Sequence, residues 1–161
     1  MTVGFILNGE DVVVQTAADK RLVDILRDSF QLTGTKAGCR TGRCGSCSVM
    51  LNGKVVPSCL IPAFQVRGGE VITLEGFSQT DEYQDIVQGF SRAGVETCGY
   101  CDGAKIFAAE ALLEHNPRPT KIEALAALSG VICRCTEASA LAAGIAAAAD
   151  IRQRRLYGRS A

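Results

Sequence analysis

Eight cysteines are the residues of this sequence best suited to chemistry, and their spacing divides them into two groups. The first group has the pattern C-x4-C-x2-C-x11-C and consists of Cys39, Cys44, Cys47 and Cys59. The second group combines a C-x2-C pair with a C-x-C pair, and consists of Cys98, Cys101, Cys133 and Cys135. Because thiolates are preferred ligands of iron and zinc, each group predicts a metal site.

The first group is the more diagnostic of the two. Its first three cysteines have the plant-type spacing of a 2Fe-2S site. Glycines alternate with them at Gly38, Gly42 and Gly45. Glycine permits positive φ angles and close backbone approach, so we expect amide N–H groups to point at the cluster sulfurs. Cys59 lies beyond an expected hairpin, which would fold the chain back and complete the ligand set.

The second group leaves the metal open. Each of its pairs falls in a connector before an expected helix, and two such loops at one end of a bundle could bring four thiolates together. The amides of the helix N-termini would favour their negative charge. Neither pair has a diagnostic spacing by itself, so the spacing favours iron–sulfur and zinc about equally.

The hydrophobic pattern predicts the elements that position these loops. Short apolar runs next to Asn-Gly turns predict strands at 5–7, 12–15, 48–51, 54–56 and 71–74. Leu22, Ile25 and Leu26 recur at helical spacing and predict a short helix across the sheet. The later sequence, rich in Ala, Leu and Glu, predicts helices at about 82–93, 104–115, 120–128 and 139–155. The fold class is therefore α+β, with a β-rich domain at 1–77 and a four-helix bundle at 78–161.

Composition and charge exclude several classes of function. Seventeen Lys and Arg balance seventeen Asp and Glu, so no net charge attracts nucleic acid or acidic lipid. No apolar run reaches the length of a signal peptide core or a membrane span, and we expect a cytoplasmic protein whose thiols stay free for metals. The Ser and Cys residues show no partnership with His or Asp that marks a catalytic nucleophile.

Charged residues in three places have competing interpretations. Arg40, Arg43 and Arg134 lie inside the cysteine loops, either as solvated surface charge or as groups that raise cluster potentials by stabilising the reduced state. Glu110 and Glu114 are one helical turn apart and predict a solvated face. The segment 151–161 carries four arginines and no acid, which predicts either a grip on an acidic partner or a frayed end.

These motifs resemble the small iron–sulfur subunit of molybdenum hydroxylases, the xanthine dehydrogenase and aldehyde oxidoreductase family. The stretches Leu32–Cys39 and Gly42–Val49, with the later Ser58-Cys59, are similar to the family's first cluster loop. Cys98-Gly99-Tyr100-Cys101 and Cys133-Arg134-Cys135-Thr136 are similar to its second. The resemblance covers nearly the whole chain.

The resemblance implies a plant-ferredoxin-like β-grasp domain followed by a four-helix domain, each holding one 2Fe-2S cluster through four cysteines. We expect the other loop residues to surround the clusters, namely Gly38, Arg40, Gly42, Arg43, Gly45, Gly99 and Arg134. It further implies partner subunits that carry molybdopterin and commonly FAD. In the family the helical-domain cluster lies nearest the molybdenum, and the ferredoxin-like cluster passes electrons outward to FAD or another acceptor. The substrate of the complex would be a heterocycle, an aldehyde or a related compound.

Three departures from the family pattern surround the second group. Thr97 stands where the family usually has Gln, and Asp102-Gly103-Ala104 stand where Thr-Pro-Gly is usual. Glu137-Ala138 replace a common Gly-Tyr. The cysteines are retained, so these departures concern docking to a partner rather than cluster binding.

Two other classes of protein remain open from the sequence. One is a structural module with zinc at the second group, which metal content would identify. The other is a free-standing ferredoxin, which co-purification with large subunits would contradict. An oxidised extracellular disulfide protein is disfavoured, because no signal segment is evident.

Overall fold

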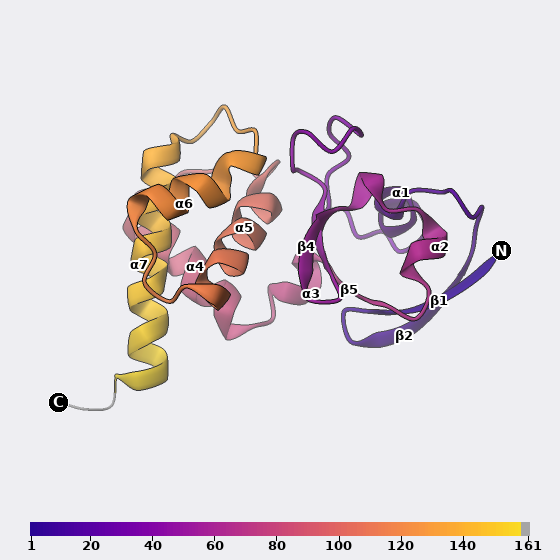
Figure 1. The fold of residues 1–161 in the computed structure, drawn as a ribbon, viewed down its shortest axis with the longest axis horizontal. Coiled ribbons are helices and arrows are strands. Elements are labelled where there is room, and N and C mark those ends of the chain that lie inside the picture. The colour runs from indigo at the N-terminus through magenta and orange to yellow at the C-terminus, as the bar shows by residue number, and fades with distance from the viewer. Residues whose placement is uncertain (159–161) are drawn as a thin grey trace.

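The first half of the chain forms a mixed β-sheet. A computed structural model describes residues 1–158, with the β-rich half beside a helical half (Figure 1). The strands are β1 (Thr2–Leu7), β2 (Glu10–Gln15), β3 (Ser48–Leu51), β4 (Lys54–Pro57) and β5 (Glu70–Ile72). Their order is β2-β1-β5-β3-β4, with β1 parallel to β5 and the other neighbours antiparallel. The predicted strands are confirmed, although β5 ends at Ile72 and Leu74 already begins a helix.

One short helix packs across this sheet, as the sequence predicts. It consists of α1 (Leu22–Asp24) and a π-helical turn, η1 (Ile25–Ser29). Leu22, Ile25 and Leu26 are buried in one core with apolar residues of β1, β3 and β5. A sheet of this order with a crossing helix is the expected β-grasp arrangement. The sequence did not predict the short helices α2 (Ala63–Val66) and α3 (Leu74–Phe77), nor the 3-10 turn η2 (Ser58–Leu60).

The second half is helical, and the four predicted helices are confirmed within a few residues. They are α4 (Asp81–Arg92), α5 (Asp102–His115), α6 (Lys121–Ala127), which continues into the 3-10 turn η3 (Leu128–Gly130), and α7 (Ala138–Tyr157). Two glycines allow α4 and α7 to pack closely. A Cβ atom at Gly89 would lie 2.5 Å from the backbone nitrogen of Ala148, and one at Gly144 would lie 2.6 Å from the Phe90 ring.

The sheet and the helices share a hydrophobic core. Met50 of β3 belongs to the same buried cluster as Ile145 of α7, and Ile72 of β5 packs against that cluster. Phe77 and Phe107 are also in it, with ring centroids 5.5 Å apart. The sheet therefore rests directly on the helical half. The domain division after residue 77 falls between α3 and α4 and stays a prediction.

Two sequence interpretations of charged residues are wrong in part, although Glu114 is exposed as the sequence predicts. Glu110 is not on a solvated face, because it is 7% exposed and its Oε2 accepts a 2.6 Å hydrogen bond from Arg152. Arg152 also donates to Asp85 at 3.3 Å, and Arg155 donates to Asp85 at 2.7 Å. These arginines of α7 therefore pair with carboxylates of this chain, because a buried charge needs a charged partner. Arg159 lies outside the described residues.

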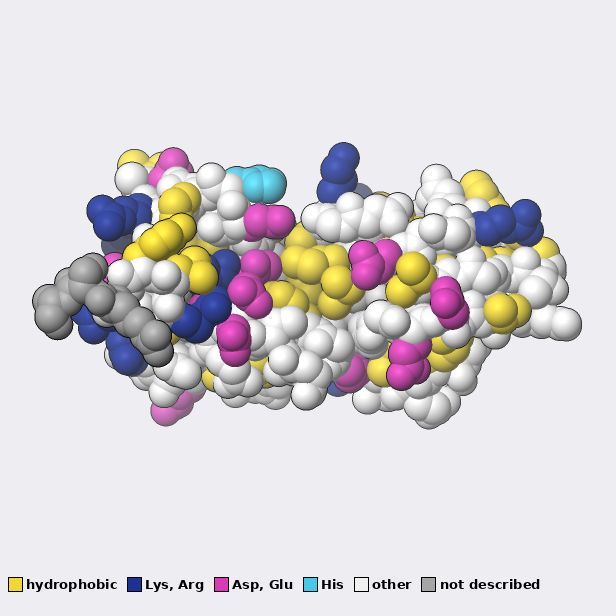
Figure 2. Space-filling view, turned by 90° about the horizontal axis from the view of Figure 1, so that it is seen from below, with side chains coloured by type: hydrophobic (Ala, Val, Ile, Leu, Met, Phe, Trp, Pro, Cys, Tyr) yellow, Lys and Arg dark blue, Asp and Glu magenta, His cyan; other side chains and the backbone are white. Residues whose placement is uncertain are grey.

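The surface shows no single dominant charge on the face drawn in Figure 2. Side chains of both signs are spread along its length, with hydrophobic side chains gathered near the middle. This distribution agrees with the balanced composition. Among the described residues, none of the helices combines the length and the apolarity of a membrane span.

Candidate metal centres

The first cysteine loop runs from η1 to β3 and curls around the sulfur of Cys39. The backbone N–H groups of Thr41, Arg43 and Cys44 donate to Cys39 Sγ at 3.4, 3.3 and 3.4 Å. The N–H of Cys39 in turn donates to Cys44 Sγ at 3.4 Å. Positive φ angles at Arg40 (58°), Gly42 (77°) and Gly45 (75°) produce this curl. Backbone amides of this loop therefore point at the sulfur of a cysteine.

Cys47 and Cys59 form the buried side of this loop. Their exposed fractions are 2% and 1%, and they belong to one buried cluster with Val23. Cys59 arrives on η2 after the β3–β4 hairpin, as the sequence predicts. Ser58 fixes the approach, because its hydroxyl donates to the carbonyl oxygen of Cys47 at 2.7 Å.

The thiols on the two sides of the loop have pKa values shifted in opposite directions. The hydroxyl and the amide of Thr41, followed by the amide of Cys44, lower the pKa of Cys39 to about 5. Burial raises the pKa of Cys47 to about 11. Since the thiolate is the metal ligand, Cys39 is already ionised at neutral pH, whereas Cys47 must release a proton when a metal binds.

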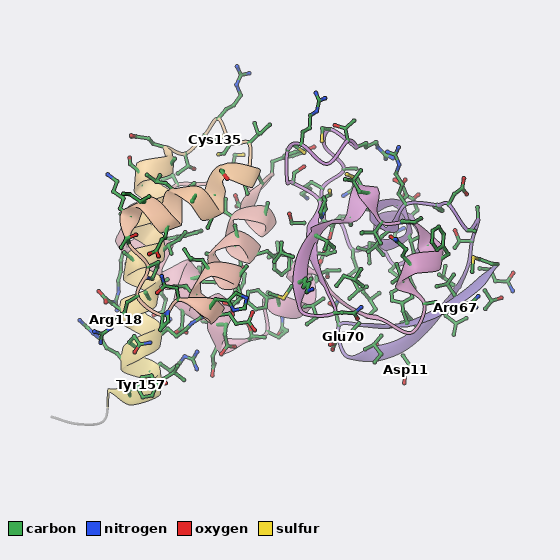
Figure 3. All side chains as sticks on the ribbon, in the orientation of Figure 1. Asp11, Arg67, Glu70, Arg118, Cys135 and Tyr157 are labelled. Carbon is green, nitrogen blue, oxygen red and sulfur yellow. The ribbon has the colours of Figure 1, made fainter. Side chains whose placement is uncertain are left out.

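The second cysteine group lies at the N-terminal end of α5 and in the loop before α7. Cys98 contacts Cys135, and Cys101 contacts Cys133. Figure 3 labels Cys135 on this loop, and Figure 1 shows that the loop and the first cysteine loop lie on the same side of the molecule, at the top of the view. Cys101 is buried, while Cys98 and Cys135 are exposed. The structure thus brings the two pairs together, as the sequence predicts.

Burial and backbone amides again divide the thiols of this second group. Burial, followed by contact with Cys133, raises the pKa of Cys101 to about 11. Burial also acts on Cys133, but the amides of Thr136 and Cys135 outweigh it and lower the pKa of Cys133 to about 7. Each group therefore contains a thiol whose pKa is lowered by backbone amides and a thiol whose pKa is raised by burial, and in the second group these two thiols are neighbours.

The arrangement of the thiols in pairs fits a 2Fe-2S cluster. All eight cysteines are free, which runs against a disulfide protein. Tetrahedral zinc with Zn–S distances of about 2.3 Å would hold four sulfurs about 3.8 Å from one another. Within residues 1–158, no three Cys, His, Asp or Glu side chains gather around one ion position. A 2Fe-2S cluster takes two thiolates on each iron, so contacting pairs, with N–H donors around them, fit that cluster.

The two cysteine loops touch each other through their backbones. The N–H of Ile132 donates to the carbonyl oxygen of Cys44 at 3.0 Å. Gly45 makes this approach possible, because a Cβ atom there would lie 2.4 Å from the carbonyl oxygen of Gly130. The sequence contains no local signal for this contact, which joins residues far apart in the chain.

The glycines that the sequence singled out lie against the sulfurs or shape the loops. A Cβ atom at Gly38 would lie 2.9 Å from Cys44 Sγ and 2.5 Å from Ser46 Oγ, so a larger residue there would displace the cysteine. Gly99, between Cys98 and Cys101, has a φ of 84°. Both positions thus require glycine for the loop to take this shape.

The three arginines in the loops are all exposed. Arg40 forms a 2.9 Å ion pair with Asp24, which offsets its charge. Arg43 and Arg134 extend from the surface of their loops. Their proposed effect on cluster potentials stays a prediction, and the solvated interpretation fits their exposure.

Lys105 is a residue of this site that sequence reasoning missed. Its side chain is fully buried on α5, one turn after Cys101. Its Nζ donates to Thr136 Oγ1 at 3.4 Å and lies 3.6 Å from Asp102 Oδ1. Burial alone would lower the pKa of Lys105, but the neighbouring Cys101 and Cys133 raise it above its ordinary value. A lysine four residues after a cysteine at a helix start could have drawn attention to it.

Comparison with known families covers both cysteine groups. A family described as "2Fe-2S iron-sulfur cluster binding domain" matches residues 5–85, and one described as "[2Fe-2S] binding domain" matches residues 73–146. The nicotinate dehydrogenase small FeS subunit of Eubacterium barkeri is 43% identical over 136 residues, which are 84% of this chain and 87% of that protein. Two 2Fe-2S domains thus account for most of the sequence.

Solved structures share the fold over nearly the whole chain. Quinoline 2-oxidoreductase from Pseudomonas putida 86 matches with a TM-score of 0.88 and 33% identity, covering 98% of this chain and 97% of that one. Aldehyde oxidoreductase from Desulfovibrio desulfuricans matches with a TM-score of 0.84 and 33% identity, covering 99% of this chain but 17% of that one. The same two-part unit therefore occurs as a separate chain and within a longer one.

Proposed function

We propose that this chain, which belongs to the small iron–sulfur subunits of the molybdenum hydroxylase family, relays electrons through two 2Fe-2S clusters within an oxidoreductase complex. Electrons enter at the helical site from a molybdopterin centre on a partner subunit. They leave from the ferredoxin-like site to FAD or another acceptor. The chain itself breaks and forms no substrate bond.

The four contacting thiol pairs support the assignment of the ligands. In this assignment Cys39 and Cys44 hold one iron of the first cluster, and Cys47 and Cys59 hold the other. The second cluster is held in the same way by Cys98 with Cys135 and Cys101 with Cys133. A bound 2Fe-2S cluster supplies one-electron oxidation and reduction. The amides around Cys39 favour the negative charge that reduction adds.

The backbone contact between the two loops is the observation that most directly supports an electron relay between the two sites. Ile132, which donates to the carbonyl of Cys44, is the neighbour of Cys133. A single hydrogen bond of 3.0 Å therefore joins the backbone next to a ligand of one cluster to a ligand of the other. This gives a short, fixed route between the sites, and it needs no motion of the protein.

The exposed face of the helical site supports an entry point for electrons. Cys98 and Cys135 are exposed, and the large apolar side chains of Tyr100 and Ile132 beside them are 51% and 61% exposed. Exposed apolar groups around a redox site suit a surface that a partner covers. The relatives named for nicotinate and quinoline suggest an aromatic heterocycle as the substrate of the complex.

Quantitative EPR on anaerobically purified protein tests this function. After reduction with dithionite, we expect two distinct spin-half signals of near-equal integral and about four irons per chain. One signal together with bound zinc would instead make the helical site structural. Co-purification with a molybdopterin-containing subunit separates a complex from a free-standing ferredoxin.

Gly45→Ala is expected to open the contact between the loops. The new Cβ would meet the carbonyl of Gly130 at 2.4 Å, which forces the backbones apart and breaks the Ile132–Cys44 hydrogen bond. We expect this overpacking to cost about 1–3 kcal/mol beyond the strain of the positive φ. Electron exchange between the clusters, followed after flash photoreduction, should slow.

Gly53→Ala provides the matched control. Gly53 has the same φ of 75°, but a Cβ atom there has nothing within 4 Å. This variant should lose about 1–2 kcal/mol of folding stability, because alanine is strained at this positive φ. Its clusters should exchange electrons at the parent rate. Equal exchange rates in both variants would argue against a route through this contact.

A further inference from the structure

Two of the departures from the family pattern around the helical site, Thr97 and Asp102, belong to a connected group of side chains. Thr97 donates from its hydroxyl to Asp102 Oδ2 at 2.6 Å. The other carboxylate oxygen, Asp102 Oδ1, lies 3.6 Å from Lys105 Nζ. Lys105 in turn donates to Thr136, whose hydroxyl donates to the carbonyl of Glu96 at 2.6 Å. The group thus links the segments before Cys98, after Cys101 and after Cys135.

The cation in this group is withdrawn from water. The side chain of Lys105 has no exposed surface, whereas that of Asp102 is 24% exposed. Among the described residues, Asp102 Oδ1 is a buried atom with no hydrogen-bond partner, so the ion pair at 3.6 Å is its polar contact. A buried charge acts on its neighbours through a lower effective dielectric than a surface charge does.

Lys105 lies on the protein side of the thiols rather than on the solvent side. It follows Cys101 by one helical turn, and its backbone N–H donates to the carbonyl oxygen of Cys101 at 3.1 Å. Its ammonium group donates to Thr136 at 3.4 Å, and the thiols of Cys101 and Cys133 are the ones that raise its pKa. These are the two thiols of one contacting pair. In contrast, Arg134 lies between two cysteines but is exposed. Lys105 is therefore the cation placed to act on the centre without solvent screening.

We propose that Lys105 raises the reduction potential of the helical-domain cluster, and that Asp102 partly offsets its charge. The inference rests on the proposed function, since it requires a 2Fe-2S cluster on the four cysteines of the helical half. One-electron reduction of that cluster would add one negative charge to it. A fixed cation beside two of the thiolates stabilises the added charge, and the Asp102 carboxylate opposes this effect.

Two substitutions of opposite sign test the proposal. Lys105→Gln removes the cation but keeps a group that can donate to Thr136, and it should lower the midpoint potential of the helical-domain cluster. Asp102→Asn removes the opposing negative charge with a side chain of nearly the same shape, and it should raise that midpoint potential. For each we expect about a tenfold change in the reduced-to-oxidised ratio at fixed potential, which is about 59 mV for a one-electron couple.

The measurement is an EPR-monitored redox titration of the purified holoprotein. The signal of the helical-domain cluster is the one that disappears in Cys101→Ala, and the other signal serves as an internal reference that should not shift. Lys121→Gln is the matched control, because it removes the same charge from an exposed site at the start of α6. It should leave both potentials unchanged.

Shifts of opposite sign at one cluster would support the proposal, because a merely structural role would not move the potential in both directions. Shifts of the same sign, or no shift, would overturn it. If Lys105→Gln fails to retain the cluster, Asp102→Asn decides alone, and an unraised potential there is contrary to the proposal. A parent protein without a second 2Fe-2S signal would overturn the proposed function itself and this inference with it.

Discussion

Cys101→Ala should abolish one of two EPR signals and leave the other at full intensity. Cys101 is buried at the start of α5, in contact with Cys133, and alanine offers no ligand in its place. With one thiolate missing, the helical site cannot complete the four-cysteine set that a 2Fe-2S cluster takes. The iron content should fall from about four to about two atoms per chain.

Cys47→Ala is the complementary variant at the ferredoxin-like site. Cys47 is also buried and also has a raised pKa, so the two substitutions remove equivalent thiols. It should remove the signal that Cys101→Ala retains. If both signals survived either substitution, the assignment of these cysteines as ligands would be wrong. Circular dichroism of each variant verifies that the remaining fold is intact.

Arg152→Met is expected to cause the largest loss of stability outside the metal sites. Arg152 donates to Glu110 at 2.6 Å and to Asp85 at 3.3 Å, and all three side chains are less than one-tenth exposed. Methionine fills similar space but leaves the Glu110 carboxylate buried without its cation. Removing one partner of a buried ion pair typically costs about 3–5 kcal/mol. Urea unfolding of the holoprotein measures the change.

A second substitution separates lost charge pairing from lost packing. In Arg152→Met/Glu110→Leu both members of the pair become apolar, while Arg155 continues to neutralise Asp85. Most of the lost stability should return, since an apolar pair of similar volume often replaces a buried ion pair without cost. Arg154→Met, on the exposed side of α7, should change stability by less than about 0.5 kcal/mol. A double variant as unstable as the single one would point to packing instead.

Local patterns in the sequence predicted the elements and the two cysteine groups. The Asn-Gly turns fix both hairpins, and Asn8 and Asn52 do adopt positive φ angles of 52° and 50°. The predicted helix at 120–128 begins with a capping box formed by Thr120 and Glu123, which are three residues apart in the sequence. Such signals lie within a few residues of one another, so they act before any tertiary contact forms. The cysteine spacing is equally local within each loop.

Long-range contacts were beyond what the sequence could predict. Glu110 looked like a surface residue because its partner Arg152 is on another helix, and only packing brings the two together. The same holds for Gly45, whose neighbour Gly130 is remote in the chain. Lysine is usually a surface residue, and Lys105 is buried only because other helices pack around it. These residues depend on tertiary structure, which no local pattern reports.

The separation of the ligands along the chain has a consequence for biosynthesis. The ligand set of the ferredoxin-like site is complete once Cys59 has left the ribosome, whereas that of the helical site needs the chain as far as Cys135. At translation rates of roughly 5–20 residues per second, the interval is roughly 4–15 s. In the proposed assignment the first cluster can thus be inserted into a shorter nascent chain than the second, which requires the chain as far as Cys135. Pulse labelling with iron during synthesis would reveal the two centres filling in that order.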